Sequence, residues 1–190
     1  TREKKVIITN TQIKNKKEIM NFINKHESIK HDFVEKGFST YDSHNLKNEK
    51  VLSNICKTFK KITDNKFEIL ELWFNKYHKG GYVKPHNHSN GDVKNKYLAG
   101  VYYFKKPKNS GNLVIKEKKI NIKEDDFVIF DISDTHYTTK NLSNQSKIVF
   151  SVNMKEKNMN DKLLQEVHNS WKSKGFPYYP KDEDWRNNIY

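Results

Sequence analysis

Cysteine is almost absent from this chain of 190 residues: Cys56 is the only one, so no internal disulfide can form. A chain of this length buries a core without cross-links, and we expect a single domain in a reducing, cytoplasmic setting. Apolar runs are short, and none approaches the roughly 18 residues of a membrane-spanning helix. The first residues, TREKKVIITN, lack the charged and then apolar layout of a signal peptide. The sequence therefore predicts an intracellular protein with no membrane partner.

Arginine is scarce as well, although the chain is strongly basic. The formal net charge is +13, from 36 Lys and Arg against 23 Asp and Glu, yet the only arginines are Arg2 and Arg186. Proteins that read bases and phosphates favour Arg, because its planar fork binds two acceptors at once. Lys and Asn are both frequent, which is typical of an AT-rich coding sequence. Nucleic acid stays open as a partner but is not favoured, and we expect the lysines to form a solvated surface.

The first third of the chain has mainly helical periodicity. Residues 12–28 and 48–63 place apolar side chains at helical spacing, and residues 6–9 have the pattern of a short strand. The polar stretch 30–47 between the helices is expected to be a loop. Cys56 lies beside the apolar face of the second helix, where we expect it to pack. Residues 1–65 are therefore expected to buttress one sheet of the domain.

From residue 66 the apolar pattern changes to alternation, which indicates strands. We expect strands at 67–77, 82–88, 97–104, 112–115, 119–122, 127–132 and 147–154, with a turn at 78–81. Short strands at close spacing without helices between them predict an antiparallel sandwich or barrel. A closing helix and an extended aromatic tail are expected within 155–190. The prediction is one structural domain, with its core at 66–154 and flanking segments at 1–65 and 155–190.

The sequence PHNHSNGD holds two histidines, His86 and His88, two positions apart. On a strand, side chains at this spacing point to one face and can hold one metal ion. His136 follows the strand expected at 127–132, and antiparallel pairing could bring it alongside as a third ligand. Three ligands on one side of a metal leave the opposite side open for substrate and oxygen. The alternative is that these histidines are exposed or satisfied without a metal.

Lys147 opens the last expected strand, 11 residues after His136. Alternation places it on one face with Val149, Ser151 and Asn153. A Lys at the inner end of a barrel strand is costly to bury unless it meets an anion such as a carboxylate. The alternative is an ordinary surface lysine.

The stretch from about residue 72 to 154 resembles the double-stranded β-helix core of Fe(II)- and 2-oxoglutarate-dependent dioxygenases, especially the prolyl hydroxylase branch. The motifs that carry the resemblance are, in order, YHKGGYVKPHNHSNGD, LAGVYYF, SGNLVI, DDFVIFDISDTH and SKIVFSVN. They cover somewhat under half of the chain, and the ordered set is more specific than any one motif. The resemblance implies a fold that is mainly β with flanking helices around a double-stranded β-helix (jelly-roll, cupin-like) core.

The resemblance also implies roles for individual residues. His86 would be the first iron ligand, His136 the distal iron ligand, and Lys147 the partner of the far carboxylate of 2-oxoglutarate. Three further residues are implied to contact 2-oxoglutarate: Tyr77, Tyr102 and Asn75. The implied cofactors are Fe(II), 2-oxoglutarate as cosubstrate and O₂, and no catalytic side chain is implied beyond the metal centre.

One position departs from the family pattern. Where the family has Asp or Glu two residues after the first histidine, this chain has His88. A site of three histidines is more positive by one charge, which changes its metal preference. Asp92 lies four residues further on, beyond a turn, and is the alternative ligand. The segment also resembles the first cupin motif, and cupins share the barrel.

The resemblance implies hydroxylation of a C–H bond in a peptide or amino-acid-type substrate, with release of succinate and CO₂. A protein or small-molecule substrate fits the same chemistry. The alternatives are a cupin-type metalloprotein, either a 2-oxoglutarate-independent dioxygenase or an isomerase, and a non-catalytic β-barrel binding module. Segments 30–47 and 175–190 are candidate lids. Four aromatic residues are expected to wall the pocket: Trp73, Tyr97, Phe104 and Phe130.

Overall fold

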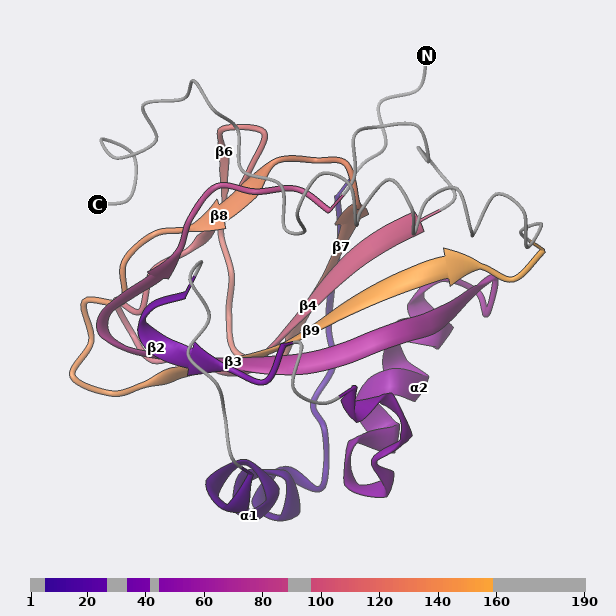
Figure 1. The fold of residues 1–190 in the computed structure, drawn as a ribbon, viewed down its shortest axis with the longest axis horizontal. Helices are drawn as coiled ribbons and strands as arrows, with labels where there is room; N and C mark the ends of the chain where they lie inside the picture. The colour runs from indigo at the N-terminus through magenta and orange to yellow at the C-terminus, as the bar shows by residue number, and fades with distance from the viewer. Residues whose placement is uncertain (1–5, 27–33, 42–44, 89–96, 159–190) are drawn as a thin grey trace.

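The computed structural model describes residues 6–26, 34–41, 45–88 and 97–158. Asp92, the expected closing helix and the aromatic tail after residue 158 lie outside the described residues. Within the described part, none of the helices is long and apolar enough to cross a membrane. The large majority of the regular elements are strands, arranged in two sheets with two short helices on one side (Figure 1).

The larger sheet is antiparallel and has the strand order β1-β7-β4-β9-β3-β2. It holds the long strand β3, which pairs with β9 from Phe67 opposite Glu156 to Tyr77 opposite Lys147. Strand β9 pairs on its other side with β4, so the three longest strands lie at the centre of the sheet. Its strands are β1 (Ile7–Asn10), β2 (Val34–Ser39), β3 (Phe67–Val83), β4 (Tyr97–Lys105), β7 (Asp126–Asp131) and β9 (Lys147–Glu156).

The smaller sheet has the order β6-β5-β8, from β5 (Leu113–Ile115), β6 (Lys118–Ile120) and β8 (His136–Thr138). The segment after β3 extends this sheet, since His86 and His136 form an antiparallel bridge. The chain thus passes from the larger sheet to the smaller one between residues 83 and 86. Two facing antiparallel sheets of this kind form a jelly-roll, as expected.

Two hydrophobic clusters lie on the two faces of the larger sheet. On one face, α1 (Lys16–Lys25) and α2 (Ser53–Ile62) pack their apolar sides, and Figure 1 shows both helices on the side away from β6 and β8. Two 3-10 turns, η1 (Leu46–Asn48) and η2 (Lys50–Leu52), lead into α2. On the other face, side chains of the two sheets meet, and this second cluster surrounds the cavity described below. Alternation along each strand divides its residues between the helix layer and the cavity.

A β-bulge at Leu70 changes which face the residues of β3 occupy. Before the bulge, Phe67 and Ile69 point toward the helices; after it, Leu72 and Phe74 do so. Strict alternation along β3 would put Ile69 on the same face as Trp73, Asn75 and Tyr77, but one extra residue shifts the period-two pattern. The bulge turns the polar residues of β3 toward the cavity.

Other differences from the expected elements have local causes. Residues 34–39 form an edge strand within the stretch expected to be a loop, and they pair with the distal half of β3. Residues 78–81 continue β3 instead of forming a turn, because the register shift between Glu35 and Gly37 accommodates them. The helix expected at 12–28 is limited to Lys16–Lys25 in the described residues. Cys56 is buried in α2, as predicted.

The helix α2 approaches the larger sheet closely at Gly100 in β4, so a larger residue at this position should destabilise the fold. A Cβ atom added at Gly100 would lie 2.6 Å from Cε1 of Phe59 and 2.8 Å from Cγ2 of Val152. We expect Gly100→Ala to lower the free energy of unfolding by about 1–3 kcal/mol, measured by urea titration. The same change should cost less in a Phe59→Leu background; equal costs in both backgrounds would show that the Phe59 contact is not the cause.

Candidate metal centre

Three histidines converge where the smaller sheet receives the segment that follows β3. His86 and His136 exchange backbone hydrogen bonds of 3.0 and 2.9 Å, which places them side by side. The backbone N–H of His88 donates to the carbonyl of Ile132 at 3.0 Å, which fixes the second histidine of the segment. The three ring centroids lie 4.2, 5.0 and 5.2 Å apart. The predicted meeting of these three residues is what the structure shows.

The imidazoles have the geometry of a metal-binding group. One possible ligand atom from each ring lies within 4.8 Å of the others, and all three residues are buried. Nδ1 of His86 lies 2.8 Å from the carbonyl of Lys84, and Nδ1 of His136 lies 2.9 Å from that of Asp134. A ring nitrogen that faces a carbonyl carries the proton, so Nε2 holds the lone pair that a metal needs.

Burial disfavours the charged form of two of these rings, His88 and His136. It lowers the pKa of His88 to about 3, with His86 as the second cause, and a hydrogen bond to Asn153 opposes the effect. It also lowers the pKa of His136 to about 3, with His88 as the second cause. Neutral imidazoles are the form that binds metal. His88 and His136 are therefore in the neutral form at neutral pH.

A cavity extends from the histidines between the two sheets. It contains about 510 Å³ of space, part of it open to solvent. Its lining is mostly apolar, with polar groups from Asn75, Tyr77, Tyr103 and Ser151. Trp73 and Phe130 form part of the wall, as expected, and Tyr97 packs in the same cluster. Phe104 does not: it packs in the cluster on the helix side of the sheet.

Lys147 lies next to this cavity and is completely buried. It does not line the cavity directly; its Nζ lies 4.7 Å from the centroid of the Tyr77 ring, which does. Among the described residues, Nζ has no hydrogen-bond partner. Burial, with a smaller effect of Lys106, lowers the pKa of Lys147 to about 7. The alternative of a surface lysine is therefore wrong. A buried ammonium group is costly without an anion beside it, and among the described residues Nζ of Lys147 has no such partner.

Two other polar atoms near Lys147 also lack partners within the described part of the chain. They are Oδ1 of Asn75 and the hydroxyl of Tyr103, both in residues that line the cavity. Burial raises the pKa of Tyr77 and of Tyr103 well above the usual value for tyrosine, so both hydroxyls remain protonated donors. Asn75 and Tyr77 thus lie where the sequence predicted them.

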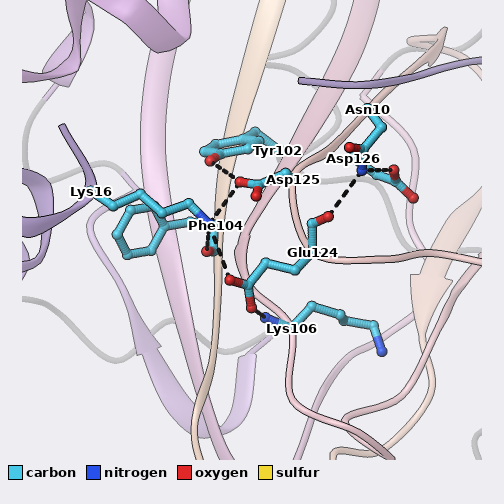
Figure 2. Close-up of polar contacts among 8 residues, drawn as sticks. All are labelled: Asn10, Lys16, Tyr102, Phe104, Lys106, Glu124, Asp125 and Asp126. Atoms are coloured by element: carbon cyan, nitrogen blue, oxygen red, sulfur yellow. Dashed lines mark hydrogen bonds and ion pairs between the residues drawn. The ribbon is translucent and has the colours of Figure 1, made fainter. Parts of the chain in front are cut away.

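Tyr102, which the resemblance implies as a 2-oxoglutarate contact, points away from the cavity. Its ring stacks on Phe127 at 4.2 Å between centroids, in the cluster on the helix side. Its hydroxyl donates to Asp125 at 2.8 Å, and Nζ of Lys16 binds the same carboxylate at 2.7 Å (Figure 2). Tyr102 therefore helps to fasten the start of α1 to the sheet, and the tyrosine beside the cavity is Tyr103. The two tyrosines are adjacent in β4, and the motif alone did not distinguish them.

Two residues of the site were not assigned a contact from the sequence. Oδ1 of Asn153 lies 2.8 Å from Nδ1 of His88, and Nδ2 of Asn153 donates to Oε2 of Glu71 at 3.0 Å. Alternation placed Asn153 on the cavity face, but only the folded register brings it behind His88. Glu71 reaches that face because of the bulge at Leu70.

Several solved structures share this fold. HygX from Streptomyces hygroscopicus, solved with nickel, 2-oxoglutarate and hygromycin B bound, superposes with a TM-score of 0.65 at 6% identity over 82% of this chain and 84% of that one. The viral collagen prolyl hydroxylase of Paramecium Bursaria Chlorella virus-1, a 2-oxoglutarate complex, gives 0.59 at 14% identity over 80% and 97%.

A Pseudomonas putida prolyl-4-hydroxylase gives a TM-score of 0.61 at 10% identity, over 80% of this chain and 92% of that one. No protein-family model matches the chain. A search of curated proteins finds no match by sequence either. At these identities the comparisons show a shared fold, which confirms the predicted jelly-roll core.

The buried histidines generate a prediction for the metal-free protein. In the unfolded chain they take up protons near pH 6.5, whereas in the folded protein His88 and His136 do so only near pH 3. The free energy of unfolding should therefore fall as the pH drops through this window, by up to about 1.4 kcal/mol per pH unit for each histidine.

Guanidinium unfolding of the metal-free protein at a series of acidic pH values measures this slope. His88→Asn should make it shallower, whereas His78→Asn, which changes an exposed histidine, should leave it unchanged. A slope unaffected by His88→Asn would mean that the His88 ring is solvated in the metal-free protein.

Proposed function

We propose that this protein is an Fe(II)- and 2-oxoglutarate-dependent dioxygenase that hydroxylates a C–H bond and releases succinate and CO₂. The observation that carries the proposal is a buried ammonium group without an anion, Lys147, beside the cavity that the three histidines border. A metal centre alone would suit many proteins with this barrel. A metal centre together with a buried cation suits a ligand that chelates the metal at one end and carries a carboxylate at the other.

The residues present fit both groups. His86, His88 and His136 would hold the metal through imidazole nitrogens, which suit Fe(II). Bound Fe(II) with 2-oxoglutarate would supply the oxidising power, since decarboxylation of the cosubstrate reduces O₂ and leaves one oxygen atom for the substrate. The protein's own contribution is to bind, to orient and to exclude water.

The carboxylate remote from the metal would be bound by the polar group around Lys147. The Lys147 ammonium neutralises its charge, and the hydroxyls of Tyr77 and Tyr103 are protonated donors beside the same cavity. The Asn75 side chain lies on the same face of β3 as Tyr77 and completes this group. Without an anion, the ammonium rests against the Tyr77 ring, a weaker interaction than a carboxylate would offer. In this proposal Tyr103 takes the role that the sequence gave to Tyr102.

Apolar walls limit the access of water next to these groups. Trp73, Phe130 and Val149 line it together with aliphatic residues of both sheets. In such surroundings, each charge interaction is stronger than in water. A desolvated cavity also limits the reaction of an activated oxidant with solvent.

For the substrate, the proposal is a peptide or an amino-acid side chain. It is supported by the likeness in fold to the two prolyl hydroxylases. A small molecule is the alternative, supported by the likeness to HygX, whose structure holds hygromycin B. Turnover assays with peptides and with amino acids as substrates separate the two.

Cosubstrate binding provides the direct test. Calorimetry with Mn(II) and N-oxalylglycine, an unreactive analogue of 2-oxoglutarate, should show one site in the native protein. Lys147→Met should weaken this binding by about 100-fold or more, because it removes a buried charge partner while it keeps the side-chain length. Lys106→Met is the matched control and should have a small effect. A metal site that binds no analogue would favour the cupin alternative, in which Lys147 has no role.

The pH dependence of analogue binding follows from the Lys147 pKa. The protonated ammonium is the form that binds a carboxylate, and its pKa is lowered to about 7 when no anion is present. Affinity should therefore be greatest below about pH 7 and should fall by up to tenfold per pH unit above it. Lys147→Arg, whose charge does not titrate in this range, should bind more weakly but with a flat profile. A native profile as flat as that of the variant would exclude Lys147 as the anion partner.

A further inference from the structure

Two side chains form a hydrogen-bonded chain behind His88. Nδ1 of His88 faces Oδ1 of Asn153 at 2.8 Å, and Nδ2 of Asn153 donates to Oε2 of Glu71 at 3.0 Å. Asn153 is completely buried, and it lies opposite Glu71 in the register of β3 and β9. The metal centre is therefore connected to a carboxylate through one amide.

The direction of this chain is fixed by the carboxylate at its end. An ionised carboxylate only accepts hydrogen bonds, so the Asn153 amide must turn its NH₂ group toward Glu71. Its oxygen then faces Nδ1 of His88 at 2.8 Å, and Nδ1 must carry the proton to donate to that oxygen. His88 is thereby held with its proton on Nδ1 and its lone pair on Nε2, the nitrogen available to a metal.

His88 differs in this respect from the other two histidines. His86 and His136 face the backbone carbonyls of Lys84 and Asp134, which accept whatever the neighbouring side chains are. Within the described residues, only His88 among the three has its Nδ1 acceptor on a side chain. The Asn153 amide could turn either its oxygen or its NH₂ group toward His88, and its hydrogen bond to Glu71 determines which.

The hydrogen bonds from His88 through Asn153 to Glu71 also affect the charge of the site. Three neutral imidazoles leave the full charge of a divalent cation uncompensated, whereas a carboxylate ligand would offset part of it. Glu71 places a negative charge behind one ligand, and hydrogen bonding transmits it toward the ring and makes Nε2 a stronger donor to the metal. Glu71, behind His88, thus supplies part of the negative charge that a carboxylate ligand of the metal would supply.

We infer that Asn153, oriented by Glu71, is a positioning residue that holds His88 as the Nδ1-protonated tautomer and strengthens its bond to the metal. The inference rests on the proposed function, because it assigns a role within the same metal centre. It concerns a property of the protein itself, the tautomer of one imidazole, that is measurable without metal or cosubstrate.

The experiment compares the native protein with three variants. Asn153→Leu removes the acceptor at similar volume, Glu71→Gln replaces the acceptor-only group by one that also donates, and Glu68→Gln is the control. Glu68 pairs with Lys155 at 2.9 Å across the same two strands without contacting His88. Long-range ¹H–¹⁵N spectra of the metal-free proteins report which nitrogen of His88 is protonated. Anaerobic titration with Fe(II), and with Mn(II), gives the metal affinity.

The expected result is Nδ1–H in the native protein and in Glu68→Gln, and a mixture of tautomers in Asn153→Leu and Glu71→Gln. Metal affinity should fall by about 10–100-fold in those two variants and stay unchanged in the control. If Asn153→Leu does not fold, Glu71→Gln decides the question alone. An unchanged tautomer and affinity in the folded variants would overturn the inference. A native protein that binds no metal would instead overturn the proposed function, whatever the tautomer result.

Discussion

The pair of backbone hydrogen bonds between His86 and His136 is the contact on which the candidate site depends. It joins the segment that leaves the larger sheet to a strand of the smaller sheet, at the point where the chain crosses between them. Because His88 is two residues along the same extended segment, the contact that fixes His86 also presents His88 to the same side. The three rings meet as a consequence of strand pairing, and their acceptors hold them in orientation.

Burial affects two kinds of titratable group around this cavity, the histidine rings and the Lys147 ammonium, and has a different consequence for each. Water is excluded from both, so the charged form of each is disfavoured. For His88 and His136 this favours the neutral state, which is the form that binds metals. For Lys147 it produces an ammonium group that loses its proton near neutral pH unless an anion is present. In the proposed function, the histidines are therefore ready for a metal in advance, whereas the anion site is completed only by its ligand.

The bulge at Leu70 reverses the faces that alternate residues of β3, the longest strand, occupy before and after it. Before the bulge, the odd-numbered residues Phe67 and Ile69 face the helices; after it, odd-numbered residues face the other way. Trp73 and Asn75 line the cavity, and Glu71 lies opposite Asn153 on the same side of β3. The opposite face of these strands packs on α1 and α2, so the sheet is held rigid from behind. Chains of contacts with the helix layer, such as Tyr102 with Asp125 and Lys16, fasten α1 to the sheet (Figure 2).

The sequence by itself determined the alternation of the strands and the spacing of the HxH pair and the distal His136, because these depend on local periodicity. It left open whether Lys147 lies inward or on the surface. Only the tertiary structure decided the rest. A one-residue bulge reverses the alternation without a clear trace in composition, so strict alternation along β3 gives the wrong face for Ile69. Tyr102 and Tyr103 are adjacent and chemically alike, so only the register of β4 separates them. Glu71 and Asn153 are 82 residues apart in the chain, and strand pairing alone brings them together behind His88.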